Sequence, residues 1–230
     1  MLKKFSILAS FVATLGVATS LAQTSQGTLY LGGGLGFSTS SEKTTFSGGN
    51  TTVNIDGDKG TNFSIVPGVG YFIIDKLSVG MDLGFNTNTF KQIDNNNSNN
   101  YDKTSTTLIS FTPYARKFFM LGDSFGFTGT FGVGVGLGSS KEERKRGNTT
   151  TTSEGPKVTT LEIGIRPGIV FFPTNKVGLE ANFGFIGFSS ITSKEENSGI
   201  TAKETTTEIG FGANSIQPTF SLGFRYYLAK

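Results

Sequence analysis

Hydrophobic and polar residues alternate along eight segments of the chain, and this period of two predicts β-strands. In residues 77–85 the odd positions are Leu, Val, Met, Leu and Phe, whereas the even positions are Ser, Gly, Asp and Gly. The eight expected strands are 27–39, 61–74, 77–89, 106–119, 124–138, 159–172, 177–189 and 214–228. Each strand therefore has one apolar face and one face of small or polar side chains.

The connections between these strands alternate between short and long. Those near 75–76, 120–123 and 173–176 are tight turns, whereas 40–60, 90–105, 139–158 and 190–213 are long, polar and expected to be solvated loops. Residues 205–212 alternate again, and they either extend the last strand or form a hairpin within a loop. Short turns at one end and long loops at the other are typical of bacterial outer-membrane barrels.

A soluble β-sandwich also alternates, with its apolar face turned to the core. The many glycines, serines and threonines on the polar face instead favour the narrow interior of a small barrel. In that case the apolar face meets lipid. The expected fold is therefore all-β, a transmembrane eight-stranded antiparallel up-and-down β-barrel.

Four strands carry a proline and, a few residues later, a pair of aromatic residues. The fourth copy is completed only if the two ends of the chain become neighbours, which favours closure. Aromatic rings at the membrane interfaces form girdles in spanning barrels. The aromatic girdle expected at the turn end consists of Tyr71, Phe72, Phe118, Phe119, Phe171, Phe172, Tyr226 and Tyr227.

Charged residues are rare in the strands, and those present share the polar face. Six are expected in the interior: Asp82, Glu162, Glu180, Arg116, Arg166 and Arg225. Eight strands leave an interior that side chains can fill, and an unpaired ion there would be costly. Equal numbers of acids and arginines therefore predict a paired network that plugs the barrel. Two alternatives are a catalytic pair of Glu162 and Glu180, and a charged column that guides a small ion.

The N-terminus has the pattern of a secretory signal: Lys3 and Lys4, an apolar run over residues 5–17, and small residues before Gln23. The expected organisation is a signal peptide over 1–22 and a barrel domain over 23–230. Cysteine and histidine are absent, which removes disulfides, thiolate chemistry and the usual general base. We expect no catalytic residue, metal or cofactor, and no enzyme activity.

Net charge does not point to nucleic acid. Two of the 20 basic residues would leave with the signal peptide, which brings the rest close to the 17 acidic residues. No basic stripe with interleaved aromatic residues is present. We therefore expect no nucleic-acid partner.

The proline, aromatic pair, turn and glycine-rich strand in residues 65–80, and again in 166–180, resemble the small outer-membrane β-barrel domain proteins common in Bacteroidetes. The resemblance implies a bacterial outer-membrane location. It also implies outer-membrane lipid and the barrel assembly machinery as partners, with a possible extracellular partner bound through the long loops. The expected function is a surface-exposed structural or interaction role. The alternatives are a narrow solute or ion channel and a lipid-modifying membrane enzyme.

Overall fold

The computed structural model describes residues 21–48, 51–94, 99–197, 200–212 and 220–228. These residues form one short 3-10 helix, η1 (Leu21–Thr24), and ten strands. The strands are β1 (Leu29–Gly48), β2 (Thr51–Ile74), β3 (Leu77–Ile93), β4 (Tyr101–Met120), β5 (Phe125–Arg146), β6 (Thr149–Thr174), β7 (Val177–Phe183), β8 (Phe185–Asn197), β9 (Ile200–Gly212) and β10 (Phe220–Leu228). The expected signal peptide lies almost wholly outside the described residues.

Eight of the strands close into an antiparallel ring. Each strand from β1 to β6 pairs with the next one along the chain, β7 pairs with β10, and β10 returns to β1. The closing ladder runs from Leu29 opposite Leu228 to Leu35 opposite Leu222. The all-β, eight-stranded antiparallel prediction is confirmed. Among the described residues, no helix is long and apolar enough to cross a membrane.

Two further strands arise from an interruption of the seventh expected strand. Gly184 has a φ of 74°, a conformation that glycine adopts without strain, and it separates β7 from β8. Beyond this point β8 continues along β6, and β9 pairs with β8 from Phe185 opposite Gly212 to Asn197 opposite Ile200. Residues 205–212 therefore belong to a hairpin.

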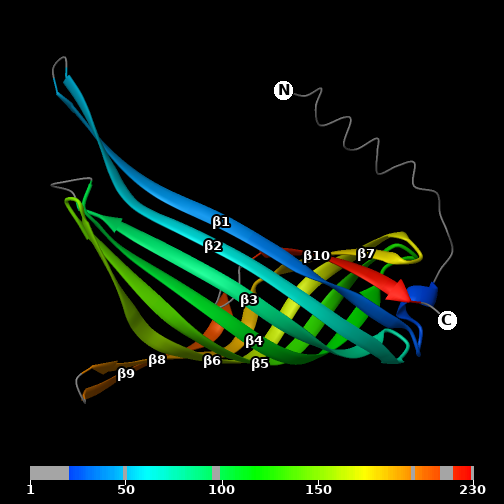
Figure 1. Cartoon of the computed structure of the whole chain (residues 1–230). Coiled ribbons are helices and arrows are strands. Elements are labelled where there is room, and N and C mark those ends of the chain that lie inside the picture. The colour runs from blue at the N-terminus through cyan, green and yellow to red at the C-terminus, as the bar shows by residue number, and fades with distance from the viewer. Residues whose placement is uncertain (1–20, 49–50, 95–98, 198–199, 213–219, 229–230) are drawn as a thin grey trace.

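The expectation of four long solvated loops is wrong over most of their length. Strand β2 has 24 residues and β6 has 26, whereas a tilted strand crosses a membrane with about 9–11. The hairpins extend far beyond the ring, and β1–β2 and β8–β9 diverge at the end opposite η1 (Figure 1). Above the membrane both faces of a strand are polar, so hydropathy gives no alternation there, although threonine favours strands.

The faces of the ring are sorted as the alternation predicts. Leu83, Phe111 and Phe131 are each about half exposed on the outside, the surface that a membrane covers. The inward positions are small or hydrogen-bonded, and several glycines leave room for large rings. A Cβ added to Gly70 would overlap the ring of Tyr30, which is fully buried.

We expect Gly70→Ala to destabilise the barrel by about 1–3 kcal/mol, because the buried Tyr30 ring has no free space to move into. The matched control is Gly129→Ala, also in a strand, where an added Cβ meets nothing within 4 Å. Urea unfolding in detergent, followed by the gel shift between folded and boiled protein, measures both. Equal stability of the two variants would contradict this packing.

A candidate functional site in the barrel interior

Two arginines bind one glutamate across the interior. Arg116 of β4 places Nη1 2.9 Å from Oε1 and 2.8 Å from Oε2 of Glu180, which lies on β7. Arg225 of β10 donates from Nε to Oε2 at 2.8 Å. The three side chains are 2–6 % exposed. We call this group the arginine–glutamate triad. Because β4 and β7 lie on different sides of the ring, the triad spans the lumen.

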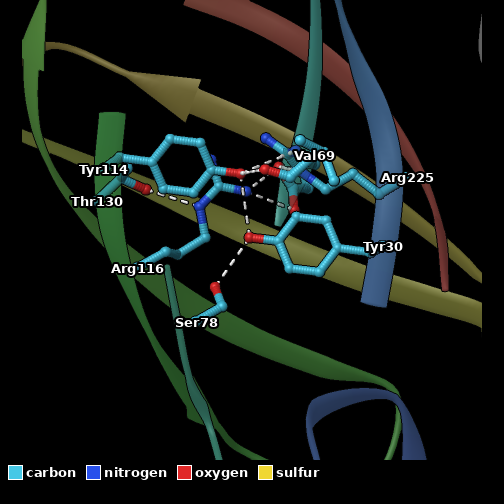
Figure 2. A network of polar contacts seen from close by, with 8 residues as sticks. Tyr30, Val69, Ser78, Tyr114, Arg116, Thr130 and Arg225 are labelled. Carbon is cyan, nitrogen blue, oxygen red and sulfur yellow. Dashed lines mark hydrogen bonds and ion pairs between the residues drawn. The ribbon is translucent and has the colours of Figure 1, made fainter. Parts of the chain in front are cut away.

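Hydroxyl groups lie around the triad, and some of them accept hydrogen bonds from its arginines. Arg116 Nε donates to Oγ1 of Thr130 at 2.8 Å. The hydroxyl of Tyr30 lies 2.8 Å from Oγ of Ser78 and 3.1 Å from the hydroxyl of Tyr114. Figure 2 shows these side chains converging from several strands. Buried arginines with this many hydrogen bonds hold strands of the ring together.

The other three predicted interior charges lie nearby. Glu162 and Arg166 form a salt bridge along β6, and the guanidinium of Arg166 lies 5.1 Å from the ring centre of Phe185. Asp82 faces the same cavity as Arg116, Arg166 and Arg225, but among the described residues no salt bridge holds it. Its Oδ1 is buried without a hydrogen-bond partner. Five of the six predicted charges therefore meet in ion pairs, and Asp82 lies outside these pairs.

An aromatic cluster fills the lumen at the turn end. It consists of Tyr30, Phe72, Phe118, Val170, Phe172 and Tyr227, all at most 3 % exposed. Neighbouring rings lie 5.3–6.4 Å apart, a typical aromatic packing distance. We call this group the aromatic plug.

The aromatic plug corrects the predicted girdle. Phe72, Phe118, Phe172 and Tyr227 do not face the membrane, because adjacent residues of a strand point to opposite faces. Each aromatic pair therefore sends one ring into the lumen and one outward. Tyr71, Phe119 and Tyr226 are 39–56 % exposed, and Phe171 is partly exposed. Of the eight residues predicted for the girdle, only these four are placed to contact lipid.

The four plug residues that belong to aromatic pairs also share a backbone arrangement. The N–H groups of Phe72, Phe118, Phe172 and Tyr227 donate to the carbonyls of Thr28, Lys76, Ser124 and Lys176, respectively, at 2.7–2.9 Å. Each acceptor lies just before the strand that pairs with the aromatic residue. Each copy of the proline and aromatic-pair repeat thus supplies one ring of the plug and one backbone hydrogen bond to the residue that precedes the paired strand.

On the hairpin side of the triad lies a cavity of about 90 Å³. Its lining includes Ser64, Asn86, Ser110, Thr112 and Asp82. This space holds only a few waters. Among the described residues, no group of three or more His, Cys, Asp or Glu is placed to hold a metal ion.

Outside the ring, the β4–β5 hairpin carries a second polar cluster. Asp102 accepts hydrogen bonds from Arg146 at 2.8 Å and Arg144 at 3.0 Å, and these lower the pKa of its carboxyl. The Tyr101 hydroxyl donates to Oε1 of Glu143 at 2.6 Å. That bond raises the pKa of Tyr101 and lowers the pKa of Glu143. These groups are exposed or half-buried at the surface, so the cluster orders the hairpin surface and contributes little to stability.

The comparison with protein families agrees with this architecture. The model of a family described as outer membrane protein beta-barrel domain matches residues 7–214. The chain belongs to this family. This outer-membrane β-barrel protein therefore resides in the bacterial outer membrane. It matches no curated protein sequence.

Solved structures of other outer-membrane proteins are also similar to it. Neisserial surface protein A is 15% identical with a TM-score of 0.35, covering 87% of this chain and 97% of its own. OprG from Pseudomonas aeruginosa is 11% identical with a TM-score of 0.41, covering 92% and 100%. Ail from Yersinia pestis is 12% identical with a TM-score of 0.33, covering 88% and 99%.

Sequence reasoning missed Tyr30 and Tyr114, whose hydroxyls lie at the centre of the network. Both have the inward parity of their strands, which is the signal that could have identified them. Tyr30 stands among leucines and glycines at the start of its strand, so its parity is easily overlooked.

We expect Glu180→Gln to destabilise the barrel by about 3–5 kcal/mol, because it leaves two buried arginines without their shared carboxylate. Glu208→Gln, on the exposed strand β9, removes the same charge and should change stability by less than about 0.5 kcal/mol. Urea titration of both variants in the same detergent gives the comparison. A stable Glu180→Gln barrel would show that the triad is dispensable.

Proposed function

We propose that this outer-membrane β-barrel protein is a closed barrel whose interior is structural and whose long hairpins act at the cell surface. Its role is that of a structural or interaction element. The observation that carries the proposal is the filling of the lumen. The aromatic plug lies at the turn end, and the triad lies next to it on the hairpin side.

The transport and enzyme alternatives fit this interior less well. A narrow channel needs a continuous polar path, whereas the plug rings are at most 3 % exposed. Glu162 and Glu180, considered above as a catalytic pair, are each bound by arginine. A carboxylate held in this way is a poor general acid or base near neutral pH. The expected partners are outer-membrane lipid, the assembly machinery and an extracellular partner of the hairpins.

In planar bilayers, we expect the purified protein to show no steady single-channel conductance, because the plug and the triad block the lumen. Phe118→Ala, which removes a plug ring, should raise the ion leak. Phe119→Ala is the matched control, since this adjacent ring points outward and is 56% exposed. Steady conductance steps from the unmodified protein that change with Arg116→Ala would overturn the closed-barrel proposal in favour of a channel.

The position of the hairpins can be tested without background, because the chain has no cysteine. A membrane-impermeant maleimide should label Thr150→Cys, at the tip of the exposed β5–β6 hairpin, on intact cells. Asn175→Cys, in a turn at the other end, should react only after lysis. Labelling of Asn175→Cys alone on intact cells would reverse the orientation and remove the surface role from the hairpins.

A further inference from the structure

The outward faces of the hairpins follow one order of residue types on all eight strands that continue into the hairpins. On β3, the outward apolar row that runs from Leu77 to Phe85 is followed by Thr87 and Thr89, and then by Lys91. On β6 the order is Leu161, Thr159 and Lys157. Every strand places one or two serines or threonines and then a lysine beyond its apolar surface. The lysines are Lys43, Lys59, Lys91, Lys103, Lys141, Lys157, Lys194 and Lys203.

We call these eight residues the lysine ring, and the strand register brings several of them side by side. Lys59 of β2 lies opposite Lys91 of β3, which lies opposite Lys103 of β4. On the other side of the barrel, Lys157, Lys194 and Lys203 are opposite one another on β6, β8 and β9. Like charges directly opposite in a sheet are destabilising. The two lysine triplets therefore lower the stability of the isolated protein.

Carboxylates are less frequent than lysines on this face. Nζ of Lys103 lies 3.4 Å from Oε2 of Glu143, and Lys194 forms a salt bridge with Glu196. In the strand register, Lys43 lies opposite Asp56 and Lys141 lies opposite Glu154, so these two lysines also have an acid as neighbour. Five further acids of the hairpins have the opposite parity and point to the inward side, namely Asp102, Glu142, Glu195, Glu204 and Glu208. Positive charge is thus concentrated on the surface that faces away from the barrel axis.

The lysine ring lies close to the edge of the apolar surface. Six of the lysines, those of the two triplets, are four or six residues beyond the end of the outward apolar row of the same strand. At about 3.3 Å per residue this is about 13–20 Å along the strand, and less along the membrane normal because strands tilt. A flexible lysine side chain can reach back over part of that height. The intervening hydroxyl groups occupy the interfacial zone.

We infer that the lysine ring binds the phosphate groups of lipid headgroups in the outer leaflet. A protein partner would contact one side of a barrel. The lysines lie on all eight of these strands, so they face the lipid that surrounds the barrel on every side. Phosphate is the anion that a lysine and a neighbouring hydroxyl can both bind. This inference rests on the outer-membrane location and not on the closed lumen, so conductance results do not affect it.

The test measures binding of lipid A carrying both phosphates by native mass spectrometry of the whole protein in detergent. Each lysine near an anionic lipid surface contributes about 1 kcal/mol, or about fivefold in affinity. The variant Lys59→Gln/Lys91→Gln/Lys103→Gln should therefore bind lipid A about 100-fold more weakly at this triplet, while binding at the second triplet is unchanged. The control Lys76→Gln/Lys117→Gln/Lys176→Gln removes the same charge at the turn end and should lose less than about threefold. Lys157→Gln/Lys194→Gln/Lys203→Gln tests the second triplet independently if the first variant fails to fold.

Further arms of the experiment identify the source of the phosphate. Dephosphorylated lipid A should bind the unmodified protein at least about 100-fold more weakly than lipid A does, because it lacks the phosphates that both triplets contact. Inorganic phosphate at the same concentration should not displace lipid A, because it lacks the acyl chains that lie on the apolar surface. Equal loss in the ring and turn-end variants, equal binding of dephosphorylated lipid, or displacement by inorganic phosphate would each overturn the inference.

Discussion

Hydrogen bonding of the backbone in lipid is the constraint on which the rest of the structure depends. No water is available there, so each strand of the sheet needs a partner on both sides. The β1–β10 ladder supplies the last partner. Closure with eight strands in turn sets the width of the lumen. That width explains why inward glycines such as Gly70 face large rings, and why Arg116 can reach Glu180 across the interior.

The narrow lumen also makes each inward side chain part of a shared network. The ring of Tyr30 belongs to the aromatic plug, and its hydroxyl contacts the Tyr114 hydroxyl, which accepts a hydrogen bond from Arg225 of the triad. Arg225 lies 5.2 Å from the same ring while it binds Glu180. Apolar packing at the turn end and ion pairing next to it therefore reinforce each other, because they share residues on the same strands.

The alternation along the chain was sufficient to predict the ring and the direction of its faces, because lipid outside and a tight lumen inside impose opposite chemistry on adjacent residues. It failed where that contrast is weak. The pair Phe171–Phe172 was assigned to one surface because both residues are aromatic, although strand geometry separates them. The hairpins were predicted as loops because water contacts both faces there. Asp82 was expected in an ion pair, but pairing depends on side-chain reach across the lumen, which parity alone does not give.

The lysine ring is apparent only from the register between paired strands, because alternation within one strand does not show which residues of other strands lie beside it. In the sequence, Lys59, Lys91 and Lys103 are isolated charges in three polar segments, and nothing links them. Once β2, β3 and β4 are aligned, they become neighbours on one face. The parity that turns Phe85 and Ile109 outward within the membrane also turns Lys91 and Lys103 outward above it, because the β3–β4 ladder continues without a register shift between these positions. Apolar, hydroxyl and cationic residues on one face thus follow the order of hydrocarbon, interface and charged headgroup across the outer leaflet.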